Sequence, residues 1–156
     1  FTDGNLSDYS KVFEPGTLEG AKGTLPGAAP TDALKASASA YWEKAQGEAL
    51  TDWSYTAESY DATVLAALAA TLGGDNSPKS VQENLHAVSG SDGGTVCTTY
   101  AECVTLIQDG SNIQYQGPSS IGPFNENNDP SSAFIGIYQF GADNKYSFLT
   151  AVEGKS

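Results

Sequence analysis

Apolar residues recur at intervals of three and four in two long stretches of the chain, residues 34–45 and 60–72. This spacing places them on one face of a helix. Thr31 precedes the first stretch as a cap for the opening N–H groups, and Gly47 follows it as a stop. Gly73 ends the second stretch in the same way. The pattern therefore predicts two consecutive helices.

Two shorter helices are expected next, and each begins at a capping residue. Ser77 stands before Pro78, and proline is well suited to the first position of a helix. Thr99 stands three residues before Glu102, which is the spacing of a capping box. We expect the helix that starts there to end at Gly110, because glycine readily adopts the left-handed backbone of a helix end.

Strand chemistry dominates the rest of the sequence. A short strand is expected near residues 21–25, and residues 113–116, 133–140 and 146–152 combine aromatic and β-branched side chains with turns between them. The last two flank the sequence GADNK, residues 141–145, which we interpret as a hairpin loop. Helices in the middle and strands towards the ends predict an α/β fold with helices packed on sheets.

The charge of the chain excludes one class of binding partner. The net charge is −12, from 19 acidic and 7 basic residues, and every basic residue is a lysine. Such a surface repels DNA and RNA and has no basic patch that could release counterions. The glycine-rich dinucleotide and phosphate-binding motifs are absent as well, so we expect no nucleic-acid partner and no cofactor.

Cys97 and Cys103 are the only cysteines. They lack the histidine cluster of a zinc site and the CxxC spacing of a redox pair, so we expect no metal there. A short disulfide is favoured over two free thiols, and it would stabilise the fold by roughly 2–3 kcal/mol. A disulfide indicates an oxidising compartment, and hence an extracytoplasmic location: periplasmic, cell-surface anchored or secreted.

Three further patterns leave alternatives open. Residues 125–129 carry five successive oxygen-bearing side chains, but no glutamate closes a calcium loop, so a polar turn is favoured. The one histidine, His86, has no nucleophile motif around it and is better explained as a structural residue. The 19 acids allow the paired carboxylates of a hydrolase, although no pair stands out.

Aromatic residues gather around the first helix and the start of the second. The group comprises Tyr41, Trp42, Trp53, Tyr55 and Tyr60. We interpret it as core packing between two helices, and the alternative is the wall of an apolar ligand pocket.

Five segments in succession point to one family. They read YDATVLAALAA, SVQENLHAVSG, CTTYAEC, IQYQGPSSIGPFNENNDP and AFIGIYQF, from residue 60 to residue 140. Their order resembles the C-terminal part of a branched-chain amino acid (Leu/Ile/Val-type) periplasmic binding protein, the substrate-binding component of an ABC transporter. Ser120-Ile121 stand where that family more often has Ser-Gly, and Asn128 replaces a turn glycine. Asparagine tolerates a positive φ, so the turn can survive.

The resemblance implies a two-lobe, type I periplasmic-binding-protein-like fold whose N-terminal half lies outside this sequence. Residues 1–25 would end a second-lobe segment, residues 26–125 would belong to the first lobe, and residues 126–156 would return to the second. Apolar helix faces would then lack their covering strands, so we expect the chain alone either to form a homo-oligomer or swapped assembly, or to depart from the two-lobe layout.

The resemblance also implies a function without catalysis. An extracytoplasmic solute-binding protein holds a branched-chain amino acid, or a related small amino acid or amide, by hinge closure, and delivers it to the membrane permease. Asp3 would receive the ligand's ammonium group, Gly4 would lie beside it, and Tyr55 would line the wall. Because the family's carboxylate-binding groups lie in the other half, we expect this chain to bind amino acids weakly or not at all. The alternatives are an extracellular hydrolase that uses paired carboxylates and a ligand-sensing domain of a receptor.

Overall fold

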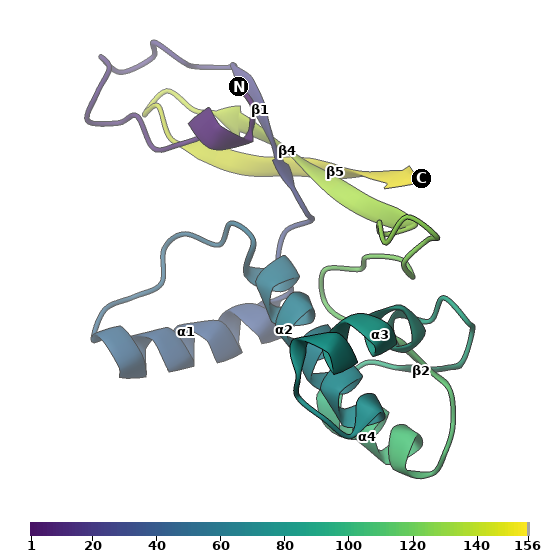
Figure 1. The fold of residues 1–156 in the computed structure, drawn as a ribbon. Coiled ribbons are helices and arrows are strands. Elements are labelled where there is room, and N and C mark those ends of the chain that lie inside the picture. Colours follow the sequence, from purple (N-terminus) through teal and green to yellow (C-terminus); the bar gives the residue numbers. More distant parts are fainter. Residues whose placement is uncertain (156) are drawn as a thin grey trace. The chain divides into compact units, whose positions relative to one another are not determined.

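The computed structural model describes residues 1–155 and divides them into two compact units. The first unit comprises Phe1–Tyr55 and Phe134–Gly154, and the second consists mainly of Thr56–Ala133. Both contain helices and strands (Figure 1), so the α/β class is confirmed. The chain passes between the units after residues 55 and 133, whereas the resemblance places the lobe boundaries after residues 25 and 125.

The first unit is built around a three-stranded sheet in the order β1-β4-β5. β1 is antiparallel to β4, with Gly23 opposite Tyr138 and Leu25 opposite Gly136. A tight turn in which the Gly141 N–H donates to the Lys145 carbonyl joins β4 to β5, as the sequence predicts. The elements of this unit are η1 (Asp3–Asn5), β1 (Lys22–Pro26), α1 (Asp32–Gln46), β4 (Ser132–Phe140) and β5 (Tyr146–Lys155).

One asparagine organises the long N-terminal loop of this unit. Asn144 is 1% exposed and has a φ of 58°, in the left-handed region that asparagine tolerates. Its side-chain amide donates to the carbonyls of Phe13 and Glu14, and its side-chain oxygen accepts from the Leu18 N–H. A residue of the hairpin turn therefore fixes a segment about 130 positions away in the sequence.

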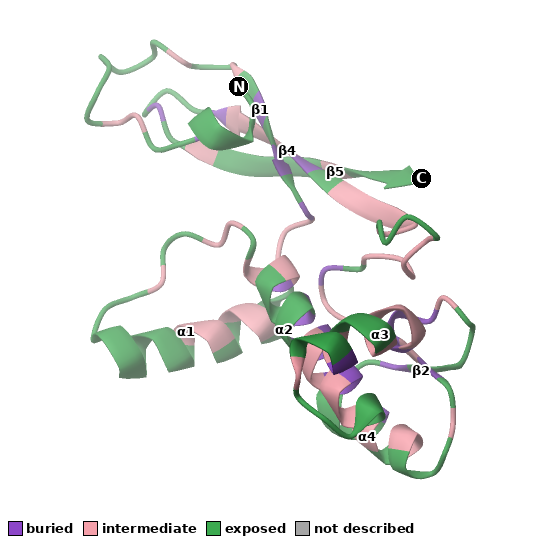
Figure 2. Cartoon of the chain, viewed as in Figure 1, coloured by how far each residue is buried: buried purple, intermediate pink, exposed green. Residues whose placement is uncertain are grey.

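Two expectations for the first unit are wrong. The sequence FTDGNLS, residues 1–7, is expected to be the end of a strand that runs into a loop, but residues 3–5 form a 3-10 helix, because Asn5 accepts from the Thr2 N–H and closes a local turn. The aromatic group is not a core between helices: α1 has no buried residue, and Tyr41 is 73% exposed. Figure 2 shows α1 drawn only in the colours of exposed and intermediate residues.

The second unit contains a two-stranded parallel sheet, β2-β3, with α4 connecting the strands. Val64, Leu65 and Leu68 of α2 are buried in its core with Val88 of α3 and Ile113 of β3. The elements are α2 (Thr56–Gly73), α3 (Pro78–Ser89), β2 (Thr95–Cys97), α4 (Tyr100–Gln108) and β3 (Ile113–Tyr115). The predicted caps are present, since Ser77 accepts from Ser80 N–H and Thr99 from Glu102 N–H.

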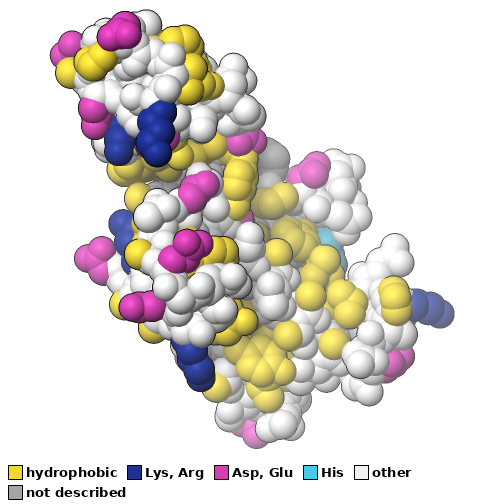
Figure 3. Space-filling model, turned by 90° about the vertical axis from the view of Figure 1, so that its left-hand side faces the viewer, with side chains coloured by type: hydrophobic (Ala, Val, Ile, Leu, Met, Phe, Trp, Pro, Cys, Tyr) yellow, Lys and Arg dark blue, Asp and Glu magenta, His cyan; other side chains and the backbone are white. Residues whose placement is uncertain are grey.

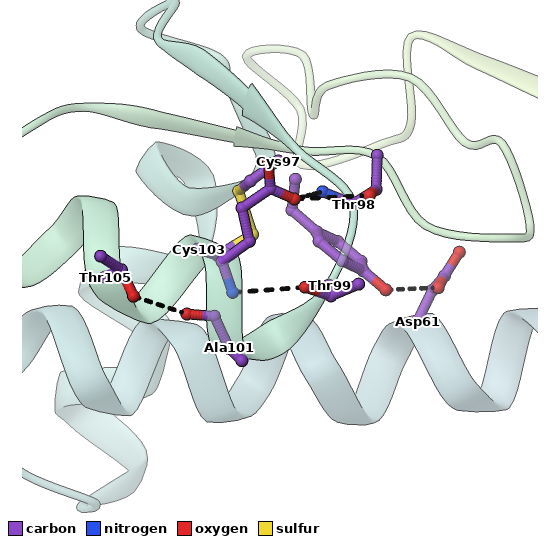
Figure 4. The surroundings of a disulfide bond; sticks show 9 residues. Asp61, Cys97, Thr98, Thr99, Ala101, Cys103 and Thr105 are labelled. Atoms are coloured by element: carbon purple, nitrogen blue, oxygen red, sulfur yellow. Dashed lines mark hydrogen bonds between the residues drawn. A yellow bond between two sulfur atoms is a disulfide. The ribbon is translucent and has the colours of Figure 1, made fainter.

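The predicted disulfide is confirmed. Cys97 at the end of β2 is bonded to Cys103 in α4, and both are fully buried. Figure 4 shows the bond joining the strand to the helix that follows it, with Cys103 N–H donating to the Thr99 carbonyl. No helix within residues 1–155 has the length and apolar character to cross a bilayer.

The segment before β4 is a polar turn. Asn125 accepts hydrogen bonds from the N–H groups of Asn127 and Asp129 through its side-chain oxygen. Asn128 has a φ of 64°, as expected of a residue that replaces a turn glycine. The structure therefore agrees with the turn interpretation of this sequence.

Candidate functional site

A cavity of about 540 Å³ lies in the first unit. Four segments line it: residues 7–8, residues 29–35 around the start of α1, residues 51–54, and the hairpin of β4 and β5 with its turn. Its volume falls within the range of roughly 300–1,000 Å³ that is typical of small-molecule sites. We therefore treat this cavity as the candidate functional site.

Four aromatic side chains line the cavity. Tyr138 comes from β4, Tyr146 and Phe148 from β5, and Trp53 from the segment before α2. Tyr146 and Phe148 are two positions apart on one strand, so they project from the same face of the sheet. The Phe148 side chain is 42% exposed. On the face of the molecule drawn in Figure 3, hydrophobic side chains likewise reach the surface and lie among acidic ones.

Four charged residues line the same cavity, and two of them are paired with each other. Lys145 Nζ lies 3.7 Å from Asp8 Oδ2. Asp8 also accepts a hydrogen bond from the Ser10 N–H at 2.8 Å. Hydrogen bonding by Ser10, with a smaller contribution from Lys145, holds the pKa of Asp8 below its usual value. Asp8 is therefore ionised and locally satisfied.

The other two charged residues have no counter-ion. Lys35, in the first turns of α1, is half-buried, and no carboxylate within residues 1–155 lies at ion-pair distance from it. Asp52 accepts from the Ser54 N–H at 2.9 Å, and it likewise has no cationic partner in the described part of the chain. The cavity therefore offers one unpaired positive and one unpaired negative group to a ligand.

The residues singled out from the sequence lie elsewhere. Asp3 and Gly4 form part of the exposed 3-10 helix, and Tyr55 follows the cavity-lining segment without lining the cavity itself. Tyr55 is 38% exposed and has a φ of 58°, an uncommon backbone conformation for an aromatic residue. The structure does not bring these three residues into the cavity.

A buried carboxylate occurs in the second unit, but it is fully satisfied. Asp61 of α2 is 1% exposed and accepts hydrogen bonds from Tyr115 OH and Ser119 N–H, both at 2.8 Å, and from the Ser119 hydroxyl. Figure 4 shows Asp61 pointing from its helix towards the hydroxyl that donates to it. Burial, followed by the bond to Asp61, raises the pKa of Tyr115. This arrangement joins α2 to the end of β3 and to the segment after it, and it leaves neither carboxylate oxygen free for chemistry.

Two other titratable residues of the second unit, Glu58 and His86, are half-buried. Burial raises the pKa of Glu58, whose Oε1 has no hydrogen-bond partner within the described residues. His86 is half-buried, and its Nε2 lies 2.9 Å from the Asn125 carbonyl oxygen, which agrees with a structural role. No group of three or more potential metal ligands is assembled within residues 1–155.

Sequence reasoning missed most of the cavity because its residues come from separated segments. Trp53 was the exception, since the aromatic group that contains it had a pocket wall as its alternative explanation. Lys35 and Asp52 belong to no recognisable sequence motif. The one available signal was indirect: Tyr146 and Phe148 alternate along a strand, and this pattern places both rings on one face.

Comparisons with protein-family models, with curated proteins and with solved structures give no match for this chain.

Proposed function

We propose that this chain is part of an extracytoplasmic solute-binding protein of an ABC importer, and that it binds a small amino acid or a related amide without catalysing a reaction. The order of segments from residue 60 to residue 140 supports the family. The cavity of the first unit supports the binding of a small molecule. The branched-chain amino acids are the ligands that the family resemblance favours.

The observation that carries the proposal is the pair of unmatched charges in the cavity. A free amino acid presents an ammonium group, a carboxylate and an apolar side chain. Asp52 complements the ammonium group, Lys35 complements the carboxylate, and the aromatic wall complements the side chain. A zwitterion therefore matches the lining better than a ligand with one charge sign or none.

The parallel sheet of the second unit supports a type I periplasmic-binding-protein-like fold. Parallel sheets normally lie inside larger α/β layers with both faces covered. β2 and β3 are only three residues each, and Val96 of β2 is 46% exposed. Such a short sheet is consistent with additional strands pairing with it, either in a longer protein or in a swapped oligomer of this chain.

The remaining features agree with an extracytoplasmic binding protein. The buried disulfide suits an oxidising compartment, where a permease would be the membrane partner. A hydrolase would need an acid whose pKa is raised within the cavity, whereas the pKa of Asp8 is lowered there. For these reasons binding is favoured over hydrolysis.

Isothermal titration of the 156-residue chain with leucine, isoleucine, valine, phenylalanine, acetamide and urea tests the proposal. We expect at least one amino acid to bind with a Kd in the micromolar to millimolar range. Lys35→Gln and Asp52→Asn should each weaken that binding by about five- to tenfold, because each removes one charge-assisted contact. Lys79→Gln is the matched control, since Lys79 is exposed and paired with Glu83 in the second unit.

Absence of heat with every compound at millimolar concentration would contradict the proposal. So would equal effects of Lys35→Gln and Lys79→Gln, because binding would then not involve the cavity. Turnover of a sugar or ester substrate by the chain would favour the hydrolase instead.

A further inference from the structure

The rings that line the cavity belong to a longer aromatic row on one face of the first unit's sheet. Tyr138 and Phe140 alternate along β4, and Tyr146 and Phe148 alternate along β5. At one end of the row Phe140 is 1% exposed, because the rings of Phe1 and Tyr9 lie against it with centroids 5.0 and 6.1 Å away. The other end, at Phe148, opens into the cavity.

The rings at the open end are held in place by the sheet. The Tyr138 ring lies over Gly136, where an added Cβ would come within 2.9 Å of ring carbon Cε2. Tyr146 is fixed from two sides, by Tyr138 at 5.6 Å and by Phe140 at 6.0 Å between ring centroids. The aromatic wall is therefore formed before any ligand arrives, which lowers the cost of ordering it on binding.

The geometry of these rings favours another ring over a branched aliphatic group. Tyr138 meets Tyr146 at 81° and Phe148 at 77°, with both pairs of centroids 5.6 Å apart. A planar ring in the cavity can stack on one of these surfaces while it presents its edge to the other, and both arrangements are favourable for aromatic pairs. A leucine or valine side chain gains contact area there but no such directional attraction.

We propose that the cavity selects an amino acid with an aromatic side chain, whose ring continues the row Phe140–Tyr146–Tyr138–Phe148. This proposal rests on the proposed function, since it specifies the ligand of the same site. The backbone end of the amino acid lies between Lys35 and Asp52, and its ring lies against Tyr138 and Phe148. Trp53, on the segment that also carries Asp52, adds a further aromatic surface to the same cavity.

Titration of the 156-residue chain with three amino acids distinguishes an effect of the aromatic ring from an effect of side-chain size. L-Phenylalanine is compared with L-leucine and with L-cyclohexylalanine, which has a similar shape and greater hydrophobicity but no π system. We expect phenylalanine to bind about tenfold more tightly than leucine and at least about threefold more tightly than cyclohexylalanine. Equal or weaker binding of phenylalanine relative to cyclohexylalanine would overturn the proposal.

A matched pair of variants then locates the selectivity. Phe148→Leu removes the most exposed ring of the wall, and Phe13→Leu removes a ring of nearly equal exposure that does not line the cavity. Both variants are expected to fold, because the side chains of Phe148 and Phe13 are 42% and 43% exposed. Phe148→Leu should reduce the preference for phenylalanine over leucine by about threefold or more, whereas Phe13→Leu should leave it unchanged.

The possible failures are distinguishable. If leucine binds as tightly as phenylalanine and Lys35→Gln weakens both, the aromatic selectivity is wrong and the proposed function stands. If none of the three amino acids binds, the selectivity is wrong, and the proposed function is wrong as well if isoleucine, valine, acetamide and urea also give no heat. If Phe148→Leu and Phe13→Leu have the same effect, the ring does not lie against Phe148 and the proposal is overturned.

Discussion

Replacement of Asp61 by alanine should destabilise the second unit strongly. The Asp61 carboxylate is 1% exposed and accepts three hydrogen bonds, one from the Tyr115 hydroxyl and two from Ser119. These bonds join α2 to the end of β3 and to the segment that follows it. The alanine variant leaves all three donors without an acceptor in a buried position.

The magnitude follows from the number of orphaned donors. A buried donor without a partner costs roughly 1–3 kcal/mol, but the three values do not add fully because water can enter the vacated space. We therefore expect Asp61→Ala to lower the free energy of unfolding by about 3–5 kcal/mol, a large share of the roughly 5–15 kcal/mol typical of a domain. Asp61→Asn keeps one acceptor oxygen, and its amide can donate to the Tyr115 oxygen, so a loss of only about 1–2 kcal/mol is expected.

Urea unfolding with two optical probes measures this effect. Both tryptophans, Trp42 and Trp53, lie in the first unit with α1, whereas the other three described helices, α2, α3 and α4, lie in the second and contribute most of the helical signal. Far-ultraviolet ellipticity should therefore report the loss in Asp61→Ala, while the tryptophan transition stays close to that of the original chain. A loss below about 1 kcal/mol would refute the claim that this carboxylate joins α2 to the rest of its unit.

Three further predictions concern stability. Replacing Cys97 and Cys103 together by serine should lower the free energy of unfolding by about 2 kcal/mol, given their separation of 6 residues, and unchanged urea unfolding would contradict this. Asn144→Asp removes both donors to backbone carbonyls of the N-terminal loop and should cost about 2–4 kcal/mol by the tryptophan signal; an unchanged transition would show that the loop is held otherwise. Glu58→Gln should stabilise the chain near neutral pH, because burial raises the pKa of Glu58 and so disfavours its charged form in the fold. That advantage should shrink as the pH falls through the raised pKa towards about pH 4, and an advantage that grows instead would contradict the assignment.

Local features of the fold were predictable from the sequence because the interactions that produce them are local. Thr31, Ser77 and Thr99 each accept from a backbone N–H three residues ahead, so the sequence alone shows where these helices begin. The turn before β4 could likewise be predicted, since the positive φ of Asn128 depends on its own side chain and its neighbours. The short disulfide follows from the same logic.

Interactions between distant residues could not be predicted in this way. Asn144 holds the N-terminal loop from about 130 residues away, and nothing in the sequence GADNK distinguishes it from an ordinary turn residue. The exposure of Tyr41 depends on which elements cover α1, and helical spacing does not contain that information. The cavity is the extreme case, because Lys35 and Asp52 become candidate ligand-binding residues only when the fold places both in the lining of one cavity with residues of β4 and β5.

A titration of the isotopically labelled 156-residue chain with L-phenylalanine, followed by two-dimensional ¹H–¹⁵N NMR, tests most directly whether the cavity is a ligand site. We predict that the largest shift changes fall on the backbone amides of Lys35 and Asp52, on the indole N–H of Trp53 and on the amides of β5 around Phe148, and that Lys35→Gln reduces them at a given ligand concentration. Changes confined to other parts of the chain, such as the 3-10 helix around Asp3, or no changes at millimolar phenylalanine, would contradict the account.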